Sequence, residues 1–125
     1  MIKIEKVINI HDILIDRFGG IHGIRDYNAL ESAINRPFMT FDQQDLYPSP
    51  TEKATALIES IISNHPFLDG NKRIGYVLMR YFLLRNGIDI SATQVEKFEF
   101  VIEIAQGKSN FDQIKNWLSA RIRNL

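Results

Sequence analysis

The sequence predicts an all-α protein: a compact helical bundle around a central buried helix, with one short extended segment. Several stretches carry apolar residues at helical spacing, and capping residues, prolines and glycines stand where these stretches begin and end. The chain has 125 residues, of which 45% are apolar, so it is long enough to bury a core. We therefore expect a single domain over residues 1–125.

The two N-terminal helices are short and well delimited. The first has an apolar face over residues 8–18 and is stopped by two glycines. The second can begin with Asp26 or Asn28 as its N-cap, and Glu31 is placed to complete a capping box from Asn28. Pro37 ends it.

Residues 36–50 show neither a helical period nor low complexity. Connections longer than about 12 residues in compact domains are usually functional or disordered, and the aromatic residues Phe38, Phe41 and Tyr47 argue against disorder. One interpretation is a surface connection whose aromatics reach the core. The other is a functional extended segment.

The third helix begins at the capping box of Ser49 and Glu52, with Pro50 at its first position, and leads to His65. After a loop, residues 74–79 and 81–84 are apolar on nearly every face, and residues 86–87 close the helix, which is typical of a central buried helix. A membrane span needs roughly 20 uninterrupted apolar residues, and Arg80 interrupts this run.

Two further helices are expected near the C-terminal end. One runs from about Val95 to Gln106, and the other starts near Phe111, with Ser109 and Asp112 at its beginning. Both are interpreted as packing elements.

The loop between the third and fourth helices contains residues suited to acid–base and metal chemistry. His65 has an ordinary pKa close to neutrality, so its neutral imidazole can accept a proton from an attacking hydroxyl. Asp69 offers the hard anionic oxygen that Mg²⁺ prefers, and Mg²⁺ usually takes only one or two carboxylates beside phosphate and water. One aspartate is therefore enough.

The four residues after Asp69 suit phosphate binding. Gly70 permits a tight turn, and the helix that begins near Asn71 presents unpaired N–H groups and the positive end of its dipole. Arg73 can donate two hydrogen bonds to a phosphate, and Lys72 adds a point charge. Asn71 can bond either phosphate or the loop backbone.

Each residue alone has an ordinary structural interpretation as a cap, a turn residue or a solvated surface cation. The fixed order of base, carboxylate, glycine and cations across one junction favours a functional site. By contrast, His11, on an amphipathic segment, and His22, between glycines, are interpreted as structural. Arg25 with Asp26 is interpreted as a cap with a local ion pair, with the alternative that Arg25, in a Gly-rich turn, faces the ligand.

The segment resembles the signature of the Fic/Doc family, His-x-Phe-x-(Asp/Glu)-Gly-Asn-Gly-Arg followed, after two intervening residues, by a second arginine. This chain matches through Asn71, then has Lys72 in place of glycine and Tyr76 in place of the second arginine, and both departures resemble the Doc (death on curing) branch. The resemblance covers almost the whole chain, including residues 18–26, 30–33, 36–37, 105–107 and 117–118.

The resemblance implies an Mg²⁺- and ATP-dependent enzyme that modifies a hydroxyl of a target protein. Its catalytic residues are expected to be His65, Lys72 and Arg73, its phosphate site Gly70, Asn71, Lys72 and Arg73, and its metal ligand Asp69. Doc-like phosphate transfer is the first choice. It also implies a toxin that acts on elongation factor Tu and is neutralised by a small antitoxin, and it makes residues 36–50 a flap beside the active site.

Two alternatives stay open. Pro66 and Gly70 match the general Fic motif more closely than Doc does, which keeps adenylyl transfer possible. A non-catalytic phosphate-binding regulator is the second. The self-inhibitory motif of the family is not cleanly present, since the nearest stretch, Thr55 to Ser60, ends in serine. We therefore expect control in trans.

Composition narrows the partners. Fifteen basic and fifteen acidic residues give a formal charge of zero, so we expect no nucleic-acid partner. The chain has no cysteine, and residues 1–6 lack the pattern of a secretion signal. We expect a cytoplasmic protein with no membrane association.

Overall fold

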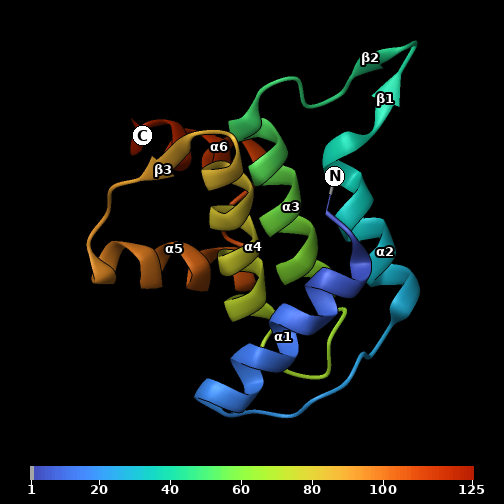
Figure 1. Cartoon of the computed structure of the whole chain (residues 1–125). Coiled ribbons are helices and arrows are strands. Elements are labelled where there is room, and N and C mark those ends of the chain that lie inside the picture. Colours follow the sequence, from blue (N-terminus) through green and yellow to red (C-terminus); the bar gives the residue numbers. More distant parts are fainter. Residues whose placement is uncertain (1) are drawn as a thin grey trace.

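The computed structural model describes residues 2–125 and consists mainly of helices (Figure 1). In chain order they are α1 (Ile4–Phe18), α2 (Tyr27–Asn35), the 3₁₀ helix η1 (Arg36–Phe38), α3 (Pro50–Asn64), α4 (Asn71–Arg85), α5 (Gln94–Ala105) and α6 (Phe111–Ser119). Two small antiparallel sheets pair β1 (Thr40–Phe41) with β2 (Gln44–Asp45), and β3 (Ile88–Ile90) with β4 (Ile122–Asn124). The predicted helical bundle is confirmed.

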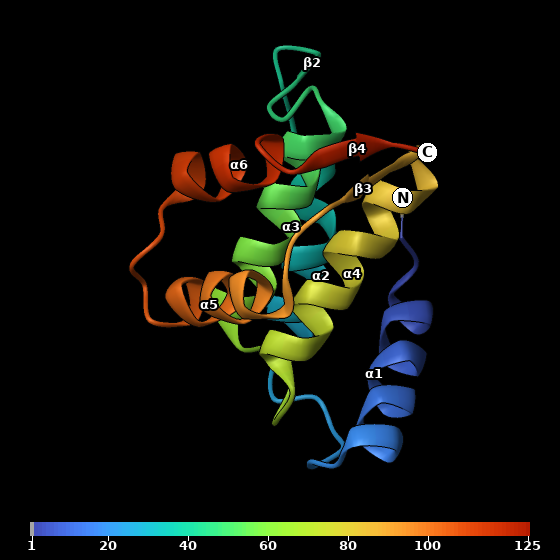
Figure 2. The same cartoon turned by 90° about the vertical axis from the view of Figure 1, so that its left-hand side faces the viewer.

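Helix α3 lies at the centre of the bundle and packs against α2, α4, α5, α6 and η1. In both ribbon views α1 lies on one side of the α3–α4 pair and α5 on the other (Figures 1 and 2). The apolar side chains of α3 are fully buried, among them Leu57, Ile58 and Ile61. The sequence pointed to α4 as the central helix, but α4 keeps one face at the surface, with Lys72 and Arg85 exposed.

A glycine lets the two central helices approach closely. A Cβ atom at Gly75 would lie 2.9 Å from Cγ1 of Ile62 and 3.4 Å from Cγ2 of Ile61. Any larger residue at Gly75 would therefore push apart α3 and α4 just beyond the loop that joins them.

The helix starts follow side-chain caps. Ser49 accepts a hydrogen bond from the backbone N–H of Glu52 at 3.1 Å, and Asp26 accepts one from Ala29 at 3.0 Å. The predicted N-cap of α3 is confirmed. Of the predicted capping box only this half is found within residues 2–125, because the Glu52 carboxylate accepts from the Ser49 hydroxyl at 3.0 Å. For α2 the cap is Asp26, and the alternative capping box from Asn28 is not formed, because Asn28 already lies inside the helix.

The C-terminal region differs from the prediction in two ways. The N-cap of α6 is Asn110, rather than Ser109 or Asp112, and its side chain forms a capping box with Gln113. The strands β3 and β4 were not predicted. Their pairing joins residues that are more than 30 positions apart, so no local pattern indicates it.

Strand β3 also explains the arginine inside α4. Asp89 is buried, and Arg80 donates to it from Nε at 3.0 Å and from Nη2 at 2.6 Å. The backbone N–H of Ile90 donates to the same carboxylate at 2.8 Å. This pair ties α4 to the β3–β4 sheet.

The extended segment forms a hairpin whose turn residues Asp42 and Gln43 have positive φ angles of 51° and 64°. Lys53, in the first turns of α3, donates to Asp45 at 3.2 Å. The hairpin therefore lies at the amino end of α3, whereas His65 follows its carboxyl end, about 22 Å away for 15 helical residues (Figure 1). The hairpin does not lie beside His65, so the interpretation of residues 36–50 as a flap next to the active site is wrong.

No helix among residues 2–125 combines the length and apolar character needed to cross a bilayer.

Candidate active site

His65 occupies the junction between the two central helices. Helix α3 ends at Asn64, and His65 adopts a left-handed conformation with φ 48° and ψ 57°, which turns the chain away from the helix axis. His65 is exposed, so its imidazole is accessible to a substrate. The prediction that α3 delivers His65 at its end is confirmed.

Asn71 holds the loop in shape. Its side-chain oxygen accepts from the backbone N–H of Phe67 at 3.0 Å, and its side-chain nitrogen donates to the carbonyl of the same residue at 3.0 Å. Phe67 is buried, so this two-point contact fixes the loop to the core. Of the two roles open to Asn71, the structure shows the loop contact.

Asp69 lies at the surface of the same loop. One carboxylate oxygen accepts from the N–H of Gly70 at 2.8 Å, and the other accepts from the N–H of Ile21 at 3.1 Å. Residues 2–125 contain no group of three or more acidic, histidine or cysteine side chains that could hold a metal ion. An exposed lone carboxylate nevertheless fits Mg²⁺ that takes its remaining ligands from phosphate and water.

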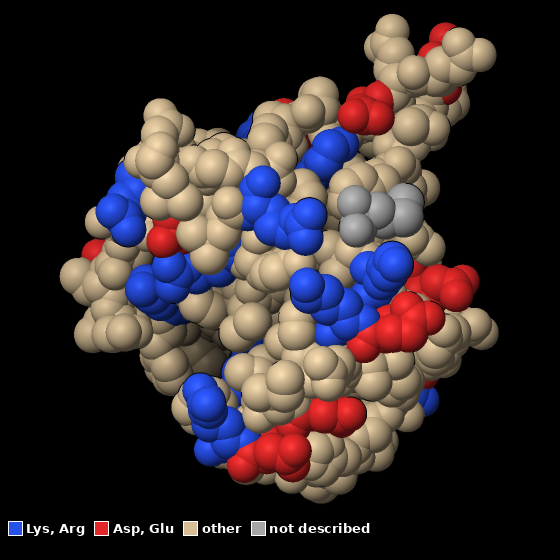
Figure 3. Space-filling model, viewed as in Figure 1, with Lys and Arg blue, Asp and Glu red and all other residues tan. Residues whose placement is uncertain are grey.

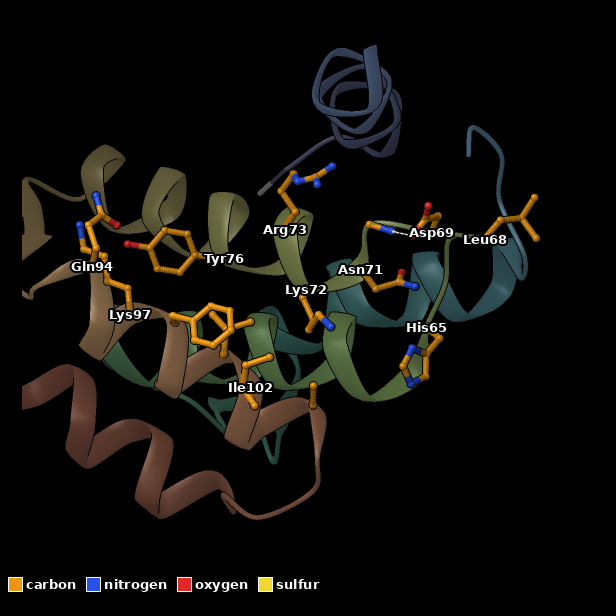
Figure 4. Close-up of a pocket in the computed structure, with 14 residues that line it drawn as sticks. His65, Leu68, Asp69, Asn71, Lys72, Arg73, Tyr76, Gln94, Lys97 and Ile102 are labelled. Carbon is orange, nitrogen blue, oxygen red and sulfur yellow. Dashed lines mark hydrogen bonds between the residues drawn. The ribbon is translucent and has the colours of Figure 1, made fainter. Parts of the chain in front are cut away.

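The two cations of the motif point in different directions (Figure 4). Arg73 extends toward α1, where it donates to the carbonyl of Gly19 at 3.1 Å and lies 5.4 Å from the ring centre of Phe18. Lys72 extends to the other side of α4, the side on which His65 lies. The amino end of α4 thus has a cation on each side, and its N-cap, Gly70, has a positive φ of 76°.

A pocket of about 880 Å³ surrounds this end of α4. One wall is the motif, and the other is a face of α5 with Tyr76 between them (Figure 4). The residues that line it are His65, Leu68, Asp69, Gly70, Asn71, Lys72, Arg73, Tyr76, Gln94, Lys97, Phe98, Val101, Ile102 and Ala105. All six candidate site residues therefore meet in one pocket.

The contribution of α5 was missed at the sequence level, where this helix was interpreted as packing. The sequence carried no signal for it, because the exposure of Phe98, which lines the pocket and is 67% exposed, appears only once the helices are packed. Apolar residues left at the surface of an otherwise amphipathic helix often mark a binding surface.

Of the interpretation of Arg25 with Asp26, the cap is confirmed at Asp26, whereas the salt bridges within residues 2–125 include none between these two residues. The guanidinium of Arg25 donates to the carbonyl of His65 from Nε at 2.5 Å and to that of Asn64 from Nη2 at 2.6 Å. The backbone N–H groups of Arg25 and Asp26 also donate to the carbonyl of Pro66, at 2.8 and 3.0 Å. Arg25 therefore closes the carboxyl end of α3 and fixes the backbone of His65.

His11 supports the loop from below. It is 1% exposed, stacks on Phe67 with ring centres 3.8 Å apart, and bonds through Nε2 to the backbone oxygen of Asp69 at 2.8 Å. This agrees with a structural role. The distant position of His11 in sequence hides the contact, which forms only because α1 packs across the loop.

His22 has a structural environment as well. Its ring nitrogens lie 2.9 Å from a carboxylate oxygen of Asp12 and 2.7 Å from one of Asp16. Hydrogen bonds that the His22 ring donates to these carboxylates, first to Asp12 and then to Asp16, raise the pKa of His22 above its ordinary value. His22 does not line the pocket.

Comparison with known proteins agrees with this geometry. Residues 1–83 match the model of the Fic/DOC family. The chain belongs to this family. It is 37% identical over 99 residues to a protein named Toxin Doc from Mycolicibacterium smegmatis, an alignment that covers 78% of this chain and 76% of the relative. It is 32% identical over 86 residues to Protein kinase doc of Escherichia phage P1, which covers 69% of this chain and 68% of the relative.

These relatives place the chain in the Doc branch of the Fic/DOC family. The family match contains the whole motif from His65 to Arg73 and ends within α4. The α5 wall of the pocket lies beyond the matched residues. The motif is therefore shared with the family, whereas the opposite wall belongs to the part of the chain that the family model does not cover.

The Arg25 contacts lead to a prediction for this Fic/DOC site. Arg25→Ala is expected to lower turnover by about tenfold, because two carbonyls at the end of α3 lose charge-assisted hydrogen bonds and His65 is less firmly placed. Measurements of kcat and KM would show the loss mainly in kcat. Arg25→Lys should recover part of the lost turnover. If both variants had an equally lowered melting temperature but an unchanged kcat, this result would contradict a positioning role.

Proposed function

We propose that this Doc-branch protein transfers a phosphoryl group from ATP to a hydroxyl of a target protein. The observation that carries the proposal is that His65 and Lys72 lie on the same side of the amino end of α4 and line one pocket (Figure 4). A base beside a cationic phosphate site is what phosphoryl transfer needs, since positioning and charge stabilisation provide most of the catalysis. A curated relative named as a protein kinase supports this choice.

In the proposed reaction His65 accepts the proton of the target hydroxyl. The hydroxyl oxygen forms a bond to the γ-phosphorus of ATP, and the bond between this phosphorus and the bridging oxygen to the β-phosphate breaks. ADP leaves with the electron pair of that bond. The open position of His65 at the end of α3 gives the target access to its ring.

The phosphates would be held at the amino end of α4. The N–H groups in the first turn of this helix are suited to phosphate oxygens, Gly70 permits the turn that exposes them, and Lys72 and Arg73 add positive charge from two sides. Arg73 would exchange its contact with the Gly19 carbonyl for a phosphate. Asp69 would hold Mg²⁺, which when bound neutralises charge on the phosphates.

Two residues favour the γ-phosphate over the α-phosphate as the group attacked. Lys72 puts a long side chain where the adenylylating relatives leave room with glycine. Tyr76 stands where those relatives have a second arginine, and burial raises its pKa, so it stays a neutral phenol. The site therefore lacks the second guanidinium expected to hold the outer phosphates in the adenylylating pose.

Adenylyl transfer is the second candidate, favoured by Pro66 and Gly70, which match the general Fic motif. ATP labelled at either the α- or the γ-phosphate separates the two reactions. We expect γ-label on the target and none from the α-position. Label from α-labelled ATP alone would establish the second candidate and exclude the first.

A substitution at Lys72 tests the reason for this choice. Lys72→Gly should reduce transfer of γ-label by about tenfold to a hundredfold, because a charge-assisted phosphate contact of about 1.5–3 kcal/mol is lost. Lys97→Gly is a matched control in the same pocket, on α5. A larger loss from the Lys97 variant would place the phosphates against α5 instead.

We also propose a biological role as a toxin that blocks translation. The relative from Mycolicibacterium smegmatis is named a toxin, and the branch suggests elongation factor Tu as the target and a small, partly disordered antitoxin that folds on binding. Incubation of purified elongation factor Tu with γ-labelled ATP and the protein would test the target. Mass spectrometry of labelled proteins in a whole extract would identify another target if elongation factor Tu stays unlabelled.

A further inference from the structure

A second pocket lies at the other end of α4. It has a volume of about 630 Å³ and is enclosed by the start of α1, the end of α4, the start of α3 and the segment before it. Arg85, at the last position of α4, lines this pocket, whereas Asn71, at the first position, lines the active site. The two sites are thus about 22 Å apart along 15 helical residues.

Positive charge collects in this second pocket. Lys3, Lys6, Lys53 and Arg85 line it, and no acidic residue does among the described part of the chain. Lys53 is paired with Asp45 at 3.2 Å, but Lys3, Lys6 and Arg85 have no ion pair within residues 2–125. In the space-filling view, basic side chains gather between the start of α1 and the end of α4 (Figure 3).

This charge is notable because the whole chain has a formal charge of zero. A concave surface with one sign of charge concentrates the electric field and attracts ligands of the opposite sign. The amino ends of α1 and α3 also border the pocket and add their positive dipole ends. The carboxyl end of α4 opposes them, and Arg85 in its last turn offsets that effect.

Tyr81 also lines the second pocket and interacts with two of its cations. Arg85 donates to its hydroxyl at 3.0 Å, and the ammonium of Lys6 lies 5.0 Å from its ring centre. Lys6, followed by Arg85, lowers the pKa of Tyr81 below its ordinary value. The cations therefore favour negative charge at this point of the pocket.

We propose that the second pocket binds a di- or triphosphate group, carried by a nucleotide or by an inorganic phosphate chain. Lys3, the N-cap of α1, and Lys6, in its first turn, act as point charges, and Arg85 can donate two hydrogen bonds, a combination suited to several phosphate oxygens at once. Phe38 and Tyr81 give the pocket aromatic walls, and its volume is within the range of small-molecule sites. Nothing in the proposed transfer reaction uses this pocket.

The test is a titration of the full chain, labelled with ¹⁵N, with sodium tripolyphosphate and separately with ATP, followed by NMR. We expect saturable shifts of the backbone amides of Lys6, Tyr81 and Arg85 with tripolyphosphate. Saturation with ATP at the same residues, with additional shifts at Phe38, would identify a nucleotide as the source. Saturation with tripolyphosphate alone would identify the inorganic chain.

A pair of double variants makes the test specific. Lys6→Gln with Arg85→Gln should weaken tripolyphosphate binding about tenfold or more, because two charged donors are lost. Arg17→Gln with Lys108→Gln changes the net charge equally, at exposed residues outside both pockets, and should leave the affinity unchanged. Equal weakening in both pairs, or shifts confined to residues 65–73 with either ligand, would overturn the proposal. The melting temperatures of all variants check that the fold is retained.

Discussion

His65→Ala is expected to lower the rate of group transfer by about 10²- to 10⁴-fold, the usual contribution of a positioned general base. The reason is geometric as well as chemical. His65 lies at the end of α3 in a left-handed turn, and Arg25 fixes its backbone through a hydrogen bond to its carbonyl. Transfer of γ-label from ATP to the target, measured in single turnover, gives the rate.

His22→Ala is the matched control for this experiment. His22 is another exposed histidine but bonds to Asp12 and Asp16 away from the pocket, so its loss should leave transfer unchanged. Expression in cells gives a second measurement, with growth arrest expected for the wild type and for His22→Ala but not for His65→Ala. Full transfer activity in His65→Ala would remove His65 from its catalytic role, and arrest by that variant would favour a non-catalytic binder.

Arg80→Met is expected to lower the free energy of unfolding by about 3 kcal/mol, the lower part of the range for breaking a buried ion pair. The substitution leaves the carboxylate of Asp89, which is 5% exposed, without the two hydrogen bonds from the guanidinium. Arg123, 3.8 Å away, is too distant to replace them. Urea unfolding followed by the fluorescence of Trp117 measures the change.

The pH dependence of the same experiment tests the mechanism. Hydrogen bonds from Arg80, together with the backbone N–H of Ile90, lower the pKa of Asp89 in the folded state. The resulting stability is present above the ordinary pKa of an aspartate and is lost as the pH falls through the lowered folded value. Arg80→Met should therefore flatten the acid limb of the stability curve.

Arg85→Met, five residues along the same helix, is the control. Its side chain is exposed, and its hydrogen bond within residues 2–125 is to the hydroxyl of Tyr81, so we expect a change within about 0.5 kcal/mol and an unchanged acid limb. If both substitutions lowered the free energy of unfolding equally, the effect would come from the loss of any arginine on α4, and the buried pair of Arg80 and Asp89 would make no additional contribution to stability.

Much of the fold follows from local signals in the sequence. The starts of α3 and α4, the cap at Ser49 and the end of α3 before His65 all agree with the prediction. These features depend on residues within one or two turns of each other, where propensity and capping act directly. For the same reason the motif from His65 to Arg73 could be recognised, since its residues are consecutive.

The sequence could not give features that depend on contacts between distant segments. The hairpin of β1 and β2 was expected beside the active site but lies at the other end of α3, because its position depends on how η1 and Lys53 hold it. The strands β3 and β4 pair across the whole of α5 and α6. Local propensity contains no information on such partners.

The same division applies to the site. The sequence by itself identified the candidate set of His65, Asp69, Lys72 and Arg73 and its place between two helices. Only the tertiary structure decided that Arg25 anchors His65, that α5 closes the pocket, and that Lys72 and Arg73 diverge around α4. The physical reason is that side-chain chemistry is a property of each residue, whereas orientation and enclosure arise only when helices far apart in the chain pack together.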